Sequence, residues 1–269
     1  MQASLIPNET PRIAGWGFAA MWQPAHTVSG DFYDFALVDQ GPLHGMVTAD
    51  VPDRGMPAAL FMALARSTIH ASLSSARTPA ESLTHANRLL CADTVRGMFV
   101  TVCYAQLDPA SGELVCVNAG HNPPRFYQRS DDRLVELART GMALGVDETC
   151  RYGQHVVNLD AGDFVLFYTD GVTEAADARQ EGFCVGRLRQ VVLEQCAASG
   201  TDIIAALRRA LDAFVGVTPQ FDDMAIEVIK RLCRAADHRF PPREQRASRQ
   251  IAVFPLGTLL WQPTRLKAA

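Results

Sequence analysis

The sequence predicts an α+β fold arranged in layers. Strand-like segments come first, two helical segments follow, and the same order repeats before one final strand. The chain has 269 residues, of which 48% are hydrophobic, so it can bury a large core in one domain with or without an extension. Four acidic positions lie at the ends of strand-like runs, where layered sheets can gather them at one edge.

The first half of the chain combines a strand meander with two helices. Strand-like segments separated by turn residues fill residues 16–51 and predict the meander. Apolar residues at helical spacing over 57–75 predict a helix that lies on the sheet. A second helix is expected from Thr78-Pro79-Ala80-Glu81, which combines a capping-box pattern with proline at the first helical position.

The second half begins with a hairpin and ends with a strand. Residues 98–107 and 113–117 flank Asp108–Gly112, whose residues favour a turn, so the pair predicts the hairpin. The remaining expected elements are strands at 126–129, 134–137, 154–159 and 163–168, helices at 186–196 and 201–214, and a strand at 224–229. The short apolar run at 251–261 carries no expected fold.

Charge divides the chain into two unequal parts. The net charge of -4 and the pI of about 6.0 give no whole-chain basis for nucleic-acid binding. Residues 230–269 hold nine basic and two acidic residues, a charge of +7, which leaves -11 for residues 1–229. We therefore expect a domain at 1–230 and a basic, partly disordered C-terminal extension at 231–269. Contact of this extension with an acidic partner or nucleic acid is the alternative.

Cysteine usage and the absence of targeting signals favour a cytoplasmic protein. The seven cysteines form no C-x-x-C pair, and several lie inside apolar runs, as expected for buried thiols in a reducing compartment. The N-terminus lacks a charged region followed by an apolar one. No stretch reaches the ~18 apolar residues that a membrane span needs.

The four acidic positions are distant in sequence but alike in context. They are Ser29-Gly30-Asp31, Ala49-Asp50-Val51, Thr169-Asp170-Gly171 and Phe221-Asp222-Asp223-Met224. Carboxylates gathered from four segments repel one another unless a cation lies between them, and hard divalent metals prefer oxygen ligands. The set predicts a Mg²⁺ or Mn²⁺ site.

Further motifs accompany these positions in a fixed order. They are Phe32–Phe35 after the first position, Gly55–Leu60 after the second, Ala119–Pro124, Thr140-Gly141 with Leu144–Val146, and Val172–Ala175 after the third. Together these segments resemble the metal-dependent serine/threonine phosphatases of the PPM superfamily, in the SpoIIE-type bacterial branch. The resemblance covers roughly residues 4 to 230.

The resemblance implies a four-layer α-β-β-α sandwich of two mainly antiparallel sheets flanked by helices, with a two-metal site at one edge. The residues that match the family's metal ligands are Asp31, Asp50, Asp170 and Asp222, joined by the Val51 backbone carbonyl. Two Mn²⁺ or Mg²⁺ ions in such a site lower the pKa of a shared water and shield the phosphate, so hydroxide attacks phosphorus in line without a covalent intermediate. No residue is an evident general acid.

Five neighbouring residues are weaker candidates for a role in the site. Asp34 and Asp223 are secondary candidates, for which ligation and a supporting or solvent-facing role are alternatives. His121 can orient a loop or a phosphate, but a turn histidine bonded to the backbone is favoured. His26 has little support, and Glu174 is expected to support a helix cap rather than orient a metal-bound water.

The chain departs from the family pattern next to Asp50. Pro52-Asp53-Arg54 stands where the family commonly carries a Ser-Gly-Lys-like stretch, so an amide donor is lost and a charge is added. Asp53 either supplements the metal site, or the altered loop weakens activity. Ala225 also replaces a hydroxyl residue that is usual after Asp-Asp-Met.

Two functions are therefore carried forward. The first is a metal-dependent phosphatase acting on phosphoserine or phosphothreonine in a protein, which the resemblance implies is a STAS-domain anti-sigma antagonist. The alternative is a weakly active or inactive regulatory binding domain with the same fold. No membrane or nucleic-acid partner is expected, and a homodimer is left open. The chain begins close to the start of the resemblance, so we expect regulation, if any, from another chain.

Overall fold

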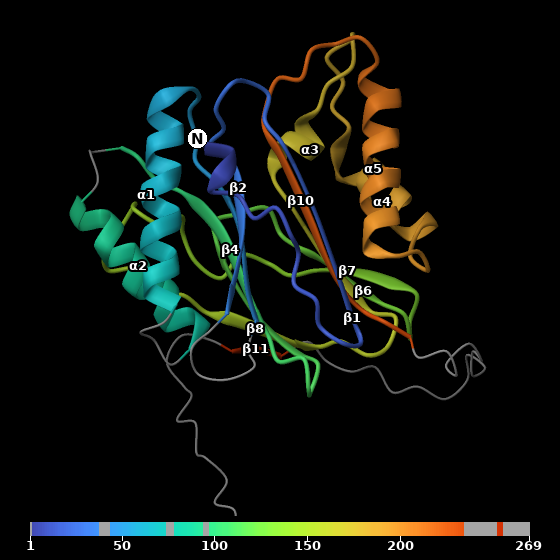
Figure 1. Ribbon diagram of the computed structural model, residues 1–269, viewed down its shortest axis with the longest axis horizontal. Helices are drawn as coiled ribbons and strands as arrows, with labels where there is room; N and C mark the ends of the chain where they lie inside the picture. The colour runs from blue at the N-terminus through green and yellow to red at the C-terminus, as the bar shows by residue number, and fades with distance from the viewer. Residues whose placement is uncertain (1, 38–43, 74–77, 94–96, 234–251, 255–269) are drawn as a thin grey trace, which may run out of the picture.

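Two antiparallel β-sheets lie face to face, and helices cover both outer faces (Figure 1). The structure is a computed structural model that describes residues 2–37, 44–73, 78–93, 97–233 and 252–254. Its layers run from one helix pair through the two sheets to a second helix pair, which confirms the four-layer α-β-β-α sandwich.

The larger sheet has the strand order β11-β8-β5-β4-β3-β2. Its strands are β2 (Phe32–Leu37), β3 (His44–Asp50), β4 (Thr101–Leu107), β5 (Glu113–Ala119), β8 (Gln154–Asn158) and β11 (Ala252–Phe254). The helices on its outer face are α1 (Met56–Leu73) and α2 (Pro79–Asp93). The amide of Glu81 donates to the Thr78 hydroxyl at 3.2 Å, so the predicted cap at the start of α2 is confirmed.

The smaller sheet has the strand order β1-β10-β9-β6-β7. Its strands are β1 (Trp16–Gln23), β6 (Arg125–Gln128), β7 (Arg133–Glu136), β9 (Phe164–Tyr168) and β10 (Met224–Arg231). The helices on its side are α3 (Asp170–Glu174), α4 (Cys184–Glu194) and α5 (Gly200–Val215), and a 3-10 turn, η1, spans Gln2–Ser4. In the described part of the chain, no helix combines the length and apolar composition that crossing a membrane requires.

Three buried clusters hold the layers together. One lies between α1, α2 and the larger sheet, with Met62, Ile69 and Leu83 fully or almost fully buried. A second joins α4 and α5 to the smaller sheet, and the third fills the space between the sheets. Phe126 and Phe167 belong to this third cluster, so the two sheets share an apolar interior.

The sequence predicted the elements better than their partners. The meander is confirmed for β2 and β3 but is wrong for β1, which pairs with β10 in the other sheet. Alternating hydrophobicity identifies a strand, but it does not say which strand lies beside it. The five-residue α3 was not predicted, because one helical turn is too short to show periodicity. The boundary between a domain at 1–230 and an extension stays a prediction; residues 234–251 and 255–269 lie outside the described part.

Candidate active site

In the larger sheet, two of the predicted carboxylates come from adjacent strand ends. Asp31 directly precedes β2, and Asp50 is the last residue of β3. The two strands are antiparallel neighbours in which Phe32 pairs with Ala49, so the start of one lies beside the end of the other. The topology therefore brings Asp31 and Asp50 together.

In the smaller sheet, the other two carboxylates meet in the same way. Asp170 is the first residue of α3, just beyond β9, and Asp222 lies shortly before β10. Because β9 and β10 are antiparallel and Tyr168 pairs with Ile226, the end of β9 adjoins the start of β10. This edge lies close to α3 in Figure 1, at the end of the sandwich where the loop before β2 also runs.

Two glycines allow the segments to approach closely at this edge. A Cβ atom on Gly30 would collide with the carbonyl oxygen of Val51, and one on Gly171 would collide with the carbonyl oxygen of Asp223. Neither obstacle is a flexible side chain, so larger residues would push the backbones apart. Gly30 thus sets the position of Asp31 relative to the Val51 carbonyl, which the family resemblance assigns as a ligand.

The electrostatics show that the four carboxylates form one interacting group. Burial, and then the Asp50 carboxylate, raise the pKa of Asp31 well above its usual value. Burial, and then Asp170, raise the pKa of Asp50 to about 7, with a smaller contribution from Asp222. The pKa of Asp170 is raised by burial first. Acidic groups are therefore concentrated here, and burial and mutual repulsion oppose their ionisation.

Thr169 supplies a hydroxyl to this group and was not singled out from the sequence. Its hydroxyl lies within hydrogen-bonding reach of Asp31, and this contact favours the ionised carboxylate. The amide of Ala225 donates to the same hydroxyl at 2.9 Å, and the amide of Thr169 donates to the Ala225 carbonyl at 3.1 Å. The residue directly before the Asp-Gly pair thus supplies a hydroxyl at the acidic edge, next to the alanine that departs from the family pattern.

The chemistry of the group fits divalent metal ions. The donors are oxygen atoms, and Oδ2 of Asp31 is buried without a hydrogen-bond partner in the described structure. The residues that would hold ions are Asp31, Asp50, Asp170 and Asp222, with the carbonyl of Val51. Within the described residues, no group of three or more acidic, histidine or cysteine side chains already has the arrangement of a metal site.

The two secondary carboxylates, Asp223 and Asp34, make contacts that stabilise neighbouring segments. Asp223 accepts hydrogen bonds from the backbone amides of Ala25 at 2.7 Å and Gly30 at 2.9 Å, which fixes the loop that carries Asp31. Asp34 pairs with Arg66 of α1 at 3.0 Å, and its exposed fraction as a side chain is only 6%. These contacts favour a supporting role for both, although Asp223 also helps to raise the pKa values of Asp31 and Asp50.

Of the remaining candidates, His121 and Glu174 lie beside the group. His121 is buried, with Nδ1 2.9 Å from the Thr101 hydroxyl, and burial lowers its pKa to about 3, so the ring is neutral. His26 is exposed. Glu174 is also exposed and helps to raise the pKa of Asp170, while Thr173 bonds the Asp170 carbonyl directly at 3.1 Å. Glu174 thus adds negative charge at the edge of the group.

The atypical loop after Asp50 directs Arg54, rather than Asp53, toward the acidic group. Asp53 is exposed and has a left-handed backbone, with φ of 85°. A guanidinium nitrogen of Arg54 lies 3.3 Å from Oδ2 of Asp222, and its carbon lies 3.6 Å above the ring centroid of Phe221. The sequence marked this loop as unusual but did not predict the pairing, because the two segments are 168 positions apart.

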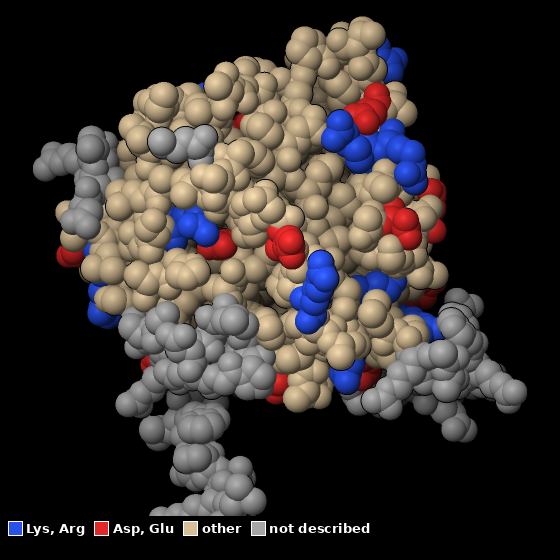
Figure 2. Space-filling view, viewed as in Figure 1, with Lys and Arg blue, Asp and Glu red and all other residues tan. Residues whose placement is uncertain are grey.

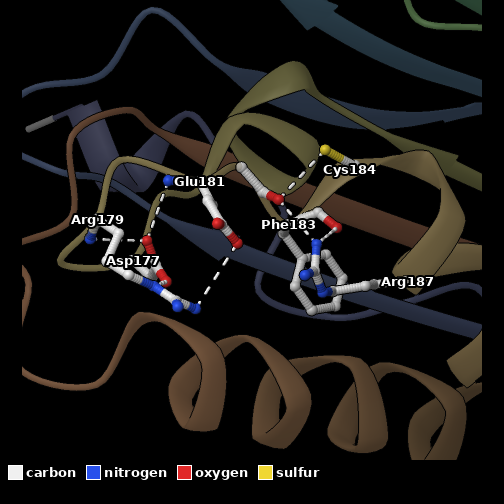
Figure 3. A network of polar contacts seen from close by, with 7 residues as sticks. Asp177, Arg179, Glu181, Phe183, Cys184 and Arg187 are labelled. Carbon is white, nitrogen blue, oxygen red and sulfur yellow. Dashed lines mark hydrogen bonds and ion pairs between the residues drawn. The ribbon is translucent and has the colours of Figure 1, made fainter.

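A polar network stabilises the loop that leaves the site after α3 (Figure 3). The Asp177 carboxylate accepts from the amides of Arg179 at 2.8 Å and Glu181 at 3.0 Å. The Arg179 guanidinium pairs with Asp177 at 3.3 Å and with Glu181 at 3.7 Å. Further along, Arg187 donates to the Phe183 carbonyl at 3.3 Å. The short helix that carries Asp170 is thus followed by a well-braced connection to α4.

Known proteins share the sequence and the fold of this chain. Protein IcfG of Synechocystis sp. is 28% identical over 259 residues, which cover 86% of this chain and 40% of that protein. Phosphoserine phosphatase RsbU of Bacillus subtilis is 27% identical over 206 residues, which cover 76% of this chain and 60% of that protein. The SiaA-PP2C domain of Pseudomonas aeruginosa has the same fold, with a TM-score of 0.71 at 22% identity, covering 79% of this chain and 85% of that one.

The match to a family model is longer than half of the chain. The family described as Stage II sporulation protein E (SpoIIE) matches residues 43–232, a range that contains Asp50, Asp170 and Asp222. The chain spans 37% to 60% of the length of three curated relatives that it matches. On the strength of this match and the order of its motifs, the chain belongs to the SpoIIE family of PPM-type proteins.

Proposed function

We propose that the chain is a metal-dependent protein phosphatase that hydrolyses phosphoserine or phosphothreonine. The observation that carries the proposal is the meeting of Asp31, Asp50 and Asp170 in one group of carboxylates with raised pKa values. Asp222, which lies just before β10, adds to the raised pKa of Asp50. The relative RsbU, named a phosphoserine phosphatase, supports the reaction class.

The chain's own residues would position the reaction. The four carboxylates and the Val51 carbonyl would hold two Mn²⁺ or Mg²⁺ ions, which when bound lower the pKa of water and neutralise charge on a phosphate. Asp31 is the most buried of the four, and it is oriented by the Thr169 hydroxyl and by a preceding loop that Asp223 fixes. A positively charged centre built this way can hydrolyse a phosphoric monoester without a protein nucleophile.

The substrate we propose is a phosphorylated protein, with a STAS-domain anti-sigma antagonist as the first candidate. The relationship to RsbU and the SpoIIE family supports this choice. Nucleic acid is a weaker candidate, because the net charge of -4 gives no whole-chain basis for binding it. On the face in Figure 2, acidic and basic side chains of the described residues are interspersed. A cytoplasmic location and a homodimer stay predictions.

One observation favours the alternative, a weakly active or inactive regulatory binding domain. Arg54 already pairs with Asp222, so a cation of the chain itself contacts one of the four carboxylates. Retention of all four carboxylates and of the close approach at Gly30 favours the enzyme over this alternative.

The test is metal-dependent release of phosphate from a phosphoserine STAS-domain protein. Wild type should release phosphate with Mn²⁺ or Mg²⁺ and stop on chelation, and Asp170→Asn should be at least about a hundredfold slower because it removes a carboxylate from the centre. Asp212→Asn on the exposed face of α5 is the control and should match wild type. Equal rates for wild type and Asp170→Asn, or no release by either, would refute the proposal. Tight binding of the phosphoprotein without release would favour the regulatory domain.

A further inference from the structure

A cation from the chain is already in contact with the acidic group. Arg54 lies on the loop directly after β3, and its guanidinium is 3.3 Å from Oδ2 of Asp222. The same guanidinium stacks on Phe221, 3.6 Å above the ring centroid. Two adjacent residues therefore contact Arg54: Asp222 through an ion pair and Phe221 through its aromatic ring.

The loop that carries Arg54 has a backbone suited to this placement. Its two neighbours both adopt left-handed conformations, with φ of 85° at Asp53 and 76° at Gly55. Left-handed geometry is uncommon for a residue other than glycine, so the turn at Asp53 is a specific feature of this loop. The loop thus reverses sharply between β3 and α1, and the Arg54 side chain spans the gap to the segment before β10.

We propose that Arg54 is an internal counter-cation that competes with a divalent ion for Asp222. The proposal rests on the metal-dependent function proposed above. An ion ligated by Asp222 would lie beside the guanidinium, and like charges at that separation repel. Binding of that ion therefore requires Arg54 to leave Asp222 and lose its contact with Phe221, which lowers the affinity of this position for the metal.

The size of the effect follows from the two contacts that are lost. The side chains of Arg54 and Asp222 are 40% and 37% exposed, so their ion pair is a weak, solvent-screened one. Stacking on an exposed aromatic ring adds a comparable amount. Together they should weaken metal binding about three- to thirtyfold relative to a chain without the arginine.

The experiment measures Mn²⁺ binding to the full chain by calorimetry, with no substrate present. Arg54→Gln should bind Mn²⁺ about three- to thirtyfold more tightly at one position. Phe221→Leu changes no charge but removes the stacking surface, so it should also tighten binding, by about two- to fivefold. The double variant should bind no more tightly than Arg54→Gln, because both changes release the same side chain. Arg208→Gln, which removes an exposed arginine paired with Asp212 on α5, should bind as wild type does.

The outcomes separate this proposal from the function on which it rests. If all variants bind Mn²⁺ equally, or if Arg54→Gln binds it more weakly, Arg54 does not compete and the proposal is overturned, while the metal centre stands. Tighter binding by Arg54→Gln with no change in Phe221→Leu would show only a general effect of charge, and would also overturn it. Failure of wild type and every variant to bind Mn²⁺ would overturn both the proposal and the metal-dependent function.

Discussion

The raised pKa of Asp50 predicts that the metal-free protein loses stability as pH increases. Burial and the neighbouring carboxylates raise the pKa from its usual 3.8 to about 7 in the folded chain. Between these values the folded chain binds a proton that the unfolded chain has released. The free energy of unfolding therefore falls with increasing pH across this window, and the loss levels off above pH 7.

The magnitude follows from the two pKa values. A single group with these pKa values lowers the free energy of unfolding by roughly 2 kcal/mol at pH 5 and roughly 4 kcal/mol at pH 8, a loss of roughly 2 to 3 kcal/mol over the range. His121 acts in the opposite direction, because its lowered pKa costs stability only where the unfolded histidine is protonated. The pH dependence of wild-type stability is therefore a sum of opposing effects. The contribution of Asp50 has to be measured as the difference in stability between wild type and a variant that lacks this carboxylate.

Urea unfolding in a chelator at pH 5, 6, 7 and 8 provides that difference. Asp50→Asn removes the titrating group, so its stability relative to wild type should increase by roughly 2 to 3 kcal/mol between pH 5 and pH 8. Asp212→Asn replaces an exposed carboxylate on α5, so its free energy of unfolding should differ from that of wild type by the same amount at every pH. With saturating Mn²⁺, which binds the ionised carboxylate, wild type should instead gain stability as pH rises. A difference between wild type and Asp50→Asn that does not vary with pH would refute the reasoning.

Two further predictions concern the backbone beside the carboxylates. Gly30→Ala should destabilise the chain by about 1–3 kcal/mol and weaken Mn²⁺ binding, because the new Cβ collides with the Val51 carbonyl. The control is Gly186→Ala in α4, where a Cβ has open space. In the same urea titration it should stabilise the chain by about 0.5–1 kcal/mol. Asp223→Ala should cost about 2 kcal/mol and speed hydrogen exchange at the amides of Ala25 and Gly30, which lose their acceptor; unchanged exchange there would contradict the assignment.

The sequence predicted most elements because their signals are local. The cap at Thr78 and the turn at 108–112 depend on residues within a few positions of one another, and both are confirmed. The partner of β1 depends on where the chain crosses between sheets, and no local pattern encodes that choice. β11 was left without a fold because three residues are too few to show alternation.

In the candidate site, too, residues with a local sequence signal were predicted, and contacts between distant segments were not. The four carboxylates were found because each lies near a strand end within a recognisable motif. The strand order brings Asp31 beside Asp50, and the packing of the two sheets brings Asp170 near Asp50. The supporting contacts were not foreseen. Asp34 meets Arg66, and Asp223 meets Gly30, only because separate segments fold side by side. Residue type alone could not separate these two carboxylates from the group of four.

The atypical loop after Asp50 leaves the proposed ligands in place and brings a guanidinium beside one of them. Proline at position 52 removes an amide donor, yet the Val51 carbonyl still lies against Gly30, and Asp50 still interacts with Asp170. The loop also places the Arg54 guanidinium, which stands at the position of the family's lysine, beside Asp222. A cation paired with Asp222 lowers metal affinity without removing a ligand, so its effect should be overcome by a higher metal concentration. On this basis, an enzyme that needs more metal explains the loop better than an inactive domain does. Near-normal turnover at saturating Mn²⁺, with a raised half-saturating concentration that Arg54→Gln restores, would distinguish the two.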